Sequence, residues 1–185
     1  MTFGGKIKGF LGSPIATFAA LKQETLGGAL KYALIWLLIF GALFGIIFAV
    51  AFGLIAGLIG LFIRVPGWVF GLGPVLIPVT IGVAVVGGIV GLFVGGAWTH
   101  LWVYLLGGRQ GYTQTFKALA YGATPAYIVG WVPYVGPLVG GIWSLVLHII
   151  GLRQLHDITT GRAVGAYLLA MFIPLIILII IAIVG

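Results

Sequence analysis

Charged residues are absent from four long stretches of this sequence, and this absence constrains the fold more than any other feature. The stretches run over Tyr32–Ile63, Val65–Gly108, Ala118–Leu152 and Ala163–Gly185. Each exceeds the roughly 18 apolar residues that mark a candidate transmembrane helix. A charge at the bilayer centre costs roughly 2.5–3.5 kcal/mol on insertion scales, so a membrane environment explains such gaps. The sequence therefore predicts an all-α integral membrane protein.

Composition supports this class and excludes others. The 185 residues are 62% hydrophobic and 6% charged, with a mean hydropathy of +1.30, which is incompatible with a soluble surface. The net charge of +7 is spread along the chain and forms no basic patch, so we expect no nucleic-acid binding. Lysines and arginines that contact anionic lipid headgroups explain the charge better. The chain has no cysteine, which excludes disulfides and thiolate chemistry.

Glycine and proline clusters divide the apolar sequence into spans. Residues 1–28 form an N-terminal cytoplasmic or interfacial segment, in which Ser13-Pro14 begins a short interfacial helix. Residues 29–185 form the membrane domain. Spans three and four are short and closely connected; we expect both to cross the bilayer, although a re-entrant hairpin is the alternative. The five spans are expected at about residues 30–62, 75–106, 113–130, 136–155 and 164–184.

The basic residues test this division and give it an orientation. With the N-terminus inside, eight of the nine lysines and arginines lie on the inner side and Arg64 lies alone on the outer side. Such an asymmetry is typical of cytoplasmic loops, and an odd number of spans places the C-terminus outside. The inner set is Lys6, Lys8, Lys22, Lys31, Arg109, Lys117, Arg153 and Arg162.

Glycines repeat at four-residue spacing in the second span. Gly87, Gly91 and Gly95 form a stripe of small residues, and such stripes let helix backbones approach closely in lipid. With 32 glycines in the chain, several such matches are expected by chance. We take this stripe as a candidate packing seam. The sequence leaves open whether it packs within one chain or between protomers of a homo-oligomer.

Two histidines, His100 and His148, are the ionisable residues expected inside spans. Ionisable residues within the membrane are candidates for function, here a proton or ligand role. The alternative is a structural hydrogen bond between helices, which a neutral histidine can make at low cost. No Asp or Glu lies in a span, which argues against a transporter built on a buried carboxylate.

The remaining polar chemistry gathers at the predicted inner surface. Glu24 and Asp157, the two acids of the chain, could pair locally with Lys22 or Arg153, or belong to a face that contacts a partner or lipid. No hydrolase, phosphate-binding or metalloprotease motif is present, and Ser144 has no carboxylate near it in sequence. We therefore expect no catalytic, cofactor or metal site. The candidate partner or lipid face comprises Glu24, Arg109, Lys117, Arg153, His156, Asp157 and Arg162.

The second half of the chain resembles a known family. The segment at residues 107–125 reads GGRQGYTQTFKALAYGATP, and residues 149–156 read IIGLRQLH. Together with Pro133, Trp143 and Arg162, this order of features resembles the core of the Yip-domain family of multi-pass membrane proteins, first described as interacting with Ypt/Rab GTPases.

The resemblance implies five helical spans, a cytoplasmic N-terminus and a non-enzymatic role in membrane trafficking through contacts with small GTPases and other membrane proteins. The long cytosolic N-terminal region of many eukaryotic members is reduced here to about thirty residues. This indicates a minimal prokaryotic member in the cytoplasmic membrane and argues against GTPase binding. The leading hypothesis is a scaffold or adaptor whose inner face contacts lipid or a protein partner. The alternative is a small transporter, channel or lipid-moving protein that uses the glycine seam and His100 and His148.

Overall fold

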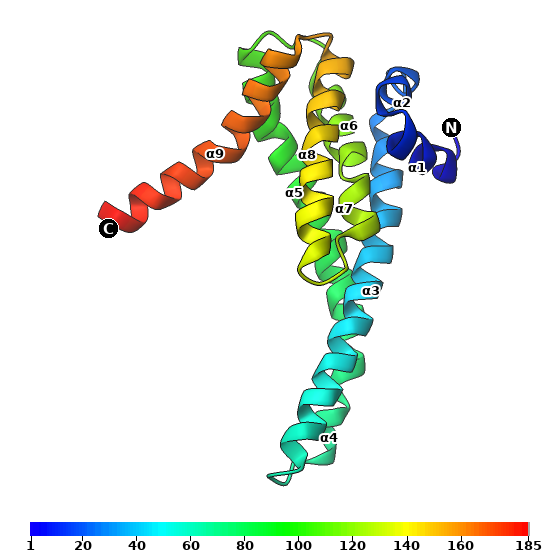
Figure 1. Ribbon diagram of the computed structural model, residues 1–185, viewed down its shortest axis with the longest axis vertical. Helices are drawn as coiled ribbons and strands as arrows, with labels where there is room; N and C mark the ends of the chain where they lie inside the picture. Colours follow the sequence, from blue (N-terminus) through cyan, green and yellow to red (C-terminus); the bar gives the residue numbers. More distant parts are fainter. Residues whose placement is uncertain (185) are drawn as a thin grey trace. The chain divides into compact units, whose positions relative to one another are not determined.

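The computed structural model describes residues 1–184 and is all-α, as the sequence predicts (Figure 1). Cα packing divides the chain into two compact units. The first unit contains Met1–Tyr32 together with the chain from Gly91 onward, and the second contains Ala33–Val90. Two long helices each contribute residues to both units.

Four helices are long and apolar enough to cross a membrane. Their positions agree closely with four of the five expected spans, because charge-free sequence of this length has no other stable way to satisfy its backbone in lipid. Helix α4, Gly67–Phe70, is a single turn that precedes the second long helix. The long helices are α3 (Leu26–Gly60), α5 (Leu72–Leu105), α8 (Val135–His156) and α9 (Thr160–Val184), which continues through Pro174.

The N-terminal segment contains two helices where one was expected. Helix α1, Phe3–Gly12, begins after Thr2, whose side-chain oxygen accepts a hydrogen bond from the amide of Gly5. Helix α2, Pro14–Ala20, begins at the proline as predicted. The Ser13 side chain makes no capping hydrogen bond. The Thr17 hydroxyl donates to the carbonyl oxygen of Ser13 at 2.9 Å.

The third expected span, residues 113–130, is not one continuous helix. It consists of α6, Tyr112–Gly122, and α7, Thr124–Val129. Pro125 causes the break because it has no amide hydrogen to donate to the carbonyl of Tyr121. The hydroxyl of Thr124 donates to that carbonyl instead, at 2.6 Å, so the backbone oxygen remains satisfied.

Helices α6, α7 and α8 form the centre of the first unit (Figure 1). They run antiparallel: Gly122 lies against His148, and Gly140 lies against Ala126. Gly151 approaches Ala118 and the ring of Phe18, which brings α2 onto the same packing surface. The core here is aromatic, and the Phe10 ring stacks on Tyr121 at a centroid distance of 5.4 Å. The N-terminal helices are therefore part of the folded unit.

In the second unit, α3 and α5 pack as an antiparallel pair. A Cβ atom at Gly41 would stand 2.8 Å from the Cα of Ile81, and one at Gly45 would stand 2.7 Å from the Cα of Ile77. The hydroxyl of Thr80 lies 3.0 Å from the carbonyl oxygen of Gly41. Small residues thus permit close contact between backbones, as expected for helices in lipid. The predicted stripe does not do this: a Cβ at Gly87, Gly91 or Gly95 would meet no atom within 4 Å.

Candidate functional site

Three loops meet at one end of the first unit and form what we call the loop face: Leu21–Thr25, Leu106–Gly111 and Asp157–Thr159. They meet because α5 and α8 end where α6 and α9 begin. Lys22 forms an ion pair with Asp157 at 2.5 Å, and the side-chain amide of Gln110 donates to the same carboxylate at 3.1 Å. The structure therefore brings together the N-terminal segment and the two loops in which most candidate face residues were expected.

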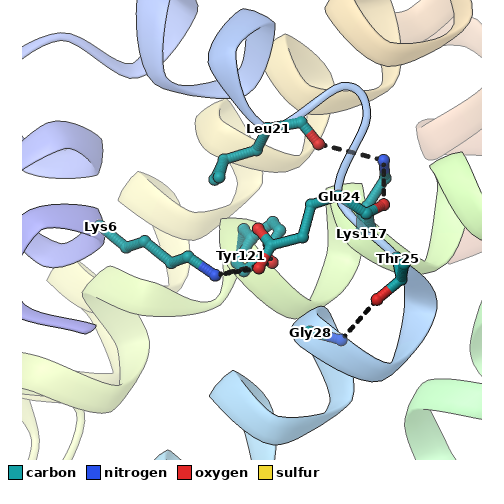
Figure 2. Close-up of polar contacts among 7 residues, drawn as sticks. All are labelled: Lys6, Leu21, Glu24, Thr25, Gly28, Lys117 and Tyr121. Atoms are coloured by element: carbon teal, nitrogen blue, oxygen red, sulfur yellow. Dashed lines mark hydrogen bonds and ion pairs between the residues drawn. The ribbon is translucent and has the colours of Figure 1, made fainter. Parts of the chain in front are cut away.

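A buried polar cluster lies beneath this face (Figure 2). Lys6 of α1 forms a 2.5 Å ion pair with Glu24 and also donates to the hydroxyl of Tyr121 at 3.2 Å. Tyr121 of α6 in turn donates to the second carboxylate oxygen of Glu24 at 2.7 Å. Lys6 is 5% exposed and Tyr121 is fully buried. Because each member has a partner, the cost of burying the charges is offset, and the N-terminal helices are fixed to α6.

Lys117 secures the loop that follows α2. Its ammonium donates to the carbonyl oxygens of Leu21, Lys22 and Glu24, at 3.1, 2.7 and 3.0 Å. Figure 2 shows the bonds to Leu21 and Glu24. These three hydrogen bonds use the full donor capacity of the ammonium group. Lys117 is 1% exposed, so it supports the loop face from inside and does not present a charge to a partner.

The carboxyl group of Glu24 is tuned by these contacts. Burial by itself raises its pKa, but the hydrogen bonds from Lys6 and Tyr121 and the positive charge of Lys6 lower it further than burial raises it. The net effect is a pKa below the ordinary value, so Glu24 stays ionised at neutral pH. The local pairing considered from sequence is wrong for both acids, since Glu24 pairs 18 residues away and Asp157 pairs 135 residues away.

Two histidines share one hydroxyl group near the loop face. Thr115 Oγ1 of α6 lies 2.8 Å from His100 Nδ1 of α5 and 2.9 Å from His156 Nε2 of α8. The three side chains therefore join three helices. His156 is 2% exposed, and its Nδ1 has no hydrogen-bond partner among the described residues. His156, like Lys117, lies inside the face.

The other predicted intramembrane histidine also joins helices. His148 Nε2 lies 3.2 Å from the carbonyl oxygen of Leu119, and Nδ1 lies 2.7 Å from the hydroxyl of Tyr167. A carbonyl only accepts, so Nε2 carries the hydrogen and Nδ1 accepts from Tyr167. Both nitrogens of a neutral imidazole are thereby used. Ser144 is likewise structural, because its hydroxyl accepts from the amide of Ala126 at 3.1 Å.

The other cations of the first unit point outward. With Glu24 paired to Lys6 and Asp157 to Lys22, the chain has no further acidic side chain to offer them. Arg109 contacts the C-terminal end of α5. Its guanidinium lies 3.9 Å from the centre of the Tyr104 ring and donates a hydrogen bond to the carbonyl oxygen of that residue. The exposed cations of this unit that form no ion pair within residues 1–184 are Lys8, Lys31, Arg109, Arg153 and Arg162.

Sequence reasoning missed several residues of the polar cluster. The sequence indicates Lys6 only as one more inner-side cation and Tyr121 only as part of the family motif. The one feature that could have pointed to them is the shortage of acids, because only two carboxylates are available to pair with nine lysines and arginines. Across residues 1–184, no group of three or more His, Asp or Glu side chains lies close enough to hold a metal ion.

Comparison with known proteins identifies one relationship. The Yip1 domain family model matches residues 8–183, nearly the whole chain, including all three segments of the loop face and every residue of the polar cluster beneath it except Lys6. No curated protein and no solved structure matches the chain.

Proposed function

Because this multi-pass membrane protein belongs to the Yip1 domain family, we propose that it is a membrane scaffold or adaptor whose loop face contacts anionic lipid or a protein partner. Yip1 family proteins are generally non-enzymatic. The protein would organise the membrane around it and would carry out no chemical step. We further propose that it resides in the cytoplasmic membrane of a prokaryote.

The observation that carries this proposal is the imbalance of charge after internal pairing. Both acids are held in ion pairs, while five cations of the first unit are exposed without an acidic partner. An exposed cation near an anionic leaflet is attracted by about 1 kcal/mol, so each of these cations that lies at the leaflet surface adds to the attraction of this unit for anionic lipid. The clustered loops hold that face in a defined shape.

The same charges support a five-crossing topology with the N-terminus inside. Helix α8 has 22 residues, about 33 Å at 1.5 Å per residue, which is enough to cross the hydrocarbon core. The α6–α7 pair runs antiparallel beside it, from Gly151 against Ala118 to Gly136 against Val129. A crossing α8 thus implies that α6–α7 also crosses, as the fifth span, and the C-terminus then lies outside.

The transport alternative has weaker support. His148 has both ring nitrogens engaged, and His100 is bonded to Thr115. A cavity beside the His148–Tyr167 pair is lined by seven residues, none of which is His100 or His148. A solute flux into liposomes that His148→Ala abolished would reverse this preference.

Photocrosslinking in native membranes tests the scaffold proposal. A photoreactive amino acid at Gln110 or Thr159 would report on the loop face, and one at the exposed Tyr134, on the turn between α7 and α8, is the control. We expect a reproducible lipid or protein adduct at the first two positions and a different pattern at Tyr134. The same adducts at all three positions would contradict a specific contact face.

A further inference from the structure

A small cavity opens between α5, α6 and α9 in the first unit. Its volume is about 250 Å³, and its walls include Trp98 and Thr99, Leu119, Tyr167 and Met171. This is below the roughly 300–1,000 Å³ of most small-molecule pockets. The cavity therefore has room for part of a flexible chain and none for a complete polar ligand.

The principal polar groups in the walls are already bonded. The indole nitrogen of Trp98 donates to the carbonyl oxygen of Ala170 at 2.9 Å, and Tyr167 is bonded to His148 at 2.7 Å. A buried water needs two to four polar partners, and a polar ligand needs unsatisfied groups to bind. With these two groups engaged, Thr99 is the one other polar side chain in walls that are otherwise apolar, and such a cavity suits hydrocarbon.

The cavity lies at a defined depth below the loop face. Trp98, Leu119 and Tyr167 are each seven residues from the loop-face ends of their helices, at Leu105, Tyr112 and Thr160 respectively. Seven residues at 1.5 Å correspond to about 10 Å. If the helices start near the bilayer surface, the cavity lies within the roughly 15 Å of hydrocarbon in one leaflet.

An unpaired cation lies nearer the loop face on α9, one of the three helices that line the cavity. Arg162, in the first turn of α9, is exposed, and its guanidinium lies beside Gly107, where a Cβ atom would be 3.0 Å from Nη1. Arg162 precedes Tyr167 by five residues, about 7.5 Å along the axis. The paired acids leave it no acidic side chain, and guanidinium groups bind phosphate through parallel hydrogen bonds.

From these features we propose that the cavity between α5, α6 and α9 holds an acyl chain of an anionic phospholipid whose phosphate is bound by Arg162. Along α9, Arg162 is separated from the apolar cavity by a distance similar to that between a lipid phosphate and its hydrocarbon chain. The inference rests on the proposed function, because it requires the loop face to lie at an anionic leaflet. The lipid comes from the bilayer itself.

Native mass spectrometry of the full chain, purified in mild detergent, tests this site. Phosphatidylglycerol or phosphatidylcholine with identical acyl chains is added at equal concentration. We expect one phosphatidylglycerol to be retained with at least a several-fold preference. Arg162→Gln should remove the preference for phosphatidylglycerol. Arg153→Gln is the control, because it removes another exposed cation of the first unit, on α8, and it should leave the preference unchanged.

A second variant tests the cavity. Gly95 lines it and has open space where a Cβ would stand, so Gly95→Leu should fill the cavity while the protein folds normally. It should reduce retention of both lipids. Equal retention of the two lipids by the unaltered protein, or an unchanged preference in Arg162→Gln, would overturn the proposal.

These results are separate from those that test the scaffold role. If crosslinking from Gln110 and Thr159 gave no reproducible lipid or protein adduct while the lipid preference persisted, the scaffold role of the loop face alone would be rejected. Conversely, partner adducts at Gln110 without any lipid preference would reject the lipid site alone.

Discussion

Tyr121 donates a 2.7 Å hydrogen bond to the carboxylate of Glu24, a residue 97 positions earlier in the chain. This bond, with the Lys6 ion pair on the other carboxylate oxygen, attaches the N-terminal helices to α6. It uses one of only two acids in the protein for an internal purpose. With both acids paired, the exposed cations at or beside the loop face, Arg109 and Arg162, have no acidic partner, and this is the property that the proposed scaffold role requires.

Replacing Glu24 with Gln should loosen α1 from the first unit. The change removes a charged acceptor of two hydrogen bonds and leaves Lys6 without its anion, at a cost of roughly 1.5–3 kcal/mol. A spin label at Gly4→Cys, an exposed position in a chain without cysteine, would report the change as a larger mobile fraction.

The matched control is Asp157→Asn, which disrupts the more exposed ion pair with Lys22. Exposed pairs contribute about 0.2–1 kcal/mol, so the label should change little. Equal mobility in the Glu24 and Asp157 variants would show that the buried cluster does not hold α1.

Acid should release the same helices. The pKa of Glu24 in the folded protein lies below its ordinary value of 4.5, so its ionisation stabilises the docked state at every pH above that value. The contribution is lost as the pH falls through the lower, folded pKa. Spectra of the Gly4→Cys label recorded between pH 7 and pH 3 should show mobility rising only below about 4.5, and Glu24→Gln should flatten this dependence. A transition centred near pH 6 would implicate a histidine instead.

Replacement by alanine should have opposite effects on stability at a closely packed glycine, Gly122, and at an open one, Gly91. At Gly122 a Cβ would collide with the imidazole of His148 and stand 3.0 Å from its backbone nitrogen, so Gly122→Ala should cost about 1–3 kcal/mol through overpacking. At Gly91 the space is open, and Gly91→Ala should be neutral or slightly stabilising. Thermal unfolding in detergent measures both. A destabilised Gly91→Ala would mean that the stripe packs against a second chain.

The His148–Tyr167 bond should contribute measurably to stability. Tyr167→Phe removes the hydroxyl that donates to His148 and leaves a half-buried nitrogen unpaired, at about 1–3 kcal/mol. Tyr134→Phe, at a 95% exposed position, is the control and should not change the unfolding temperature. A liposome assay in which Tyr167→Phe altered solute flux without altering stability would favour the transport alternative.

The topology can be tested by cysteine labelling, because the chain has no cysteine of its own. Five crossings with the N-terminus inside place Thr159 inside and Tyr134 outside. A membrane-impermeant maleimide applied to intact cells should therefore label Tyr134→Cys, and label Thr159→Cys only after the cells are opened. Labelling of neither position from outside would support the alternative in which α6–α7 and α8 form a re-entrant hairpin.

The sequence by itself determined the class of this protein and the positions of its long helices. Insertion free energy depends on the local run of apolar residues, so charge-free stretches mark α3, α5, α8 and α9 without knowledge of their neighbours. It also predicted the loop-face segments on a common side, and the structure brings these segments together. The break at Pro125 was visible as a residue but not as a consequence, because helices in lipid often continue through proline, as α9 does at Pro174.

Only the tertiary structure decided which polar groups meet. Lys6, Glu24 and Tyr121 come from three separate segments, and nothing in their local sequence distinguishes this pairing from Glu24 with Lys22. The same holds for glycines: Gly122 is packed and Gly91 is open, although Gly91 is the one that lies in a four-residue glycine repeat. Hydrophobicity is a property of a segment and can be read along the chain. A contact depends on two segments at once, and folding selects it through the pairing and packing of the whole unit.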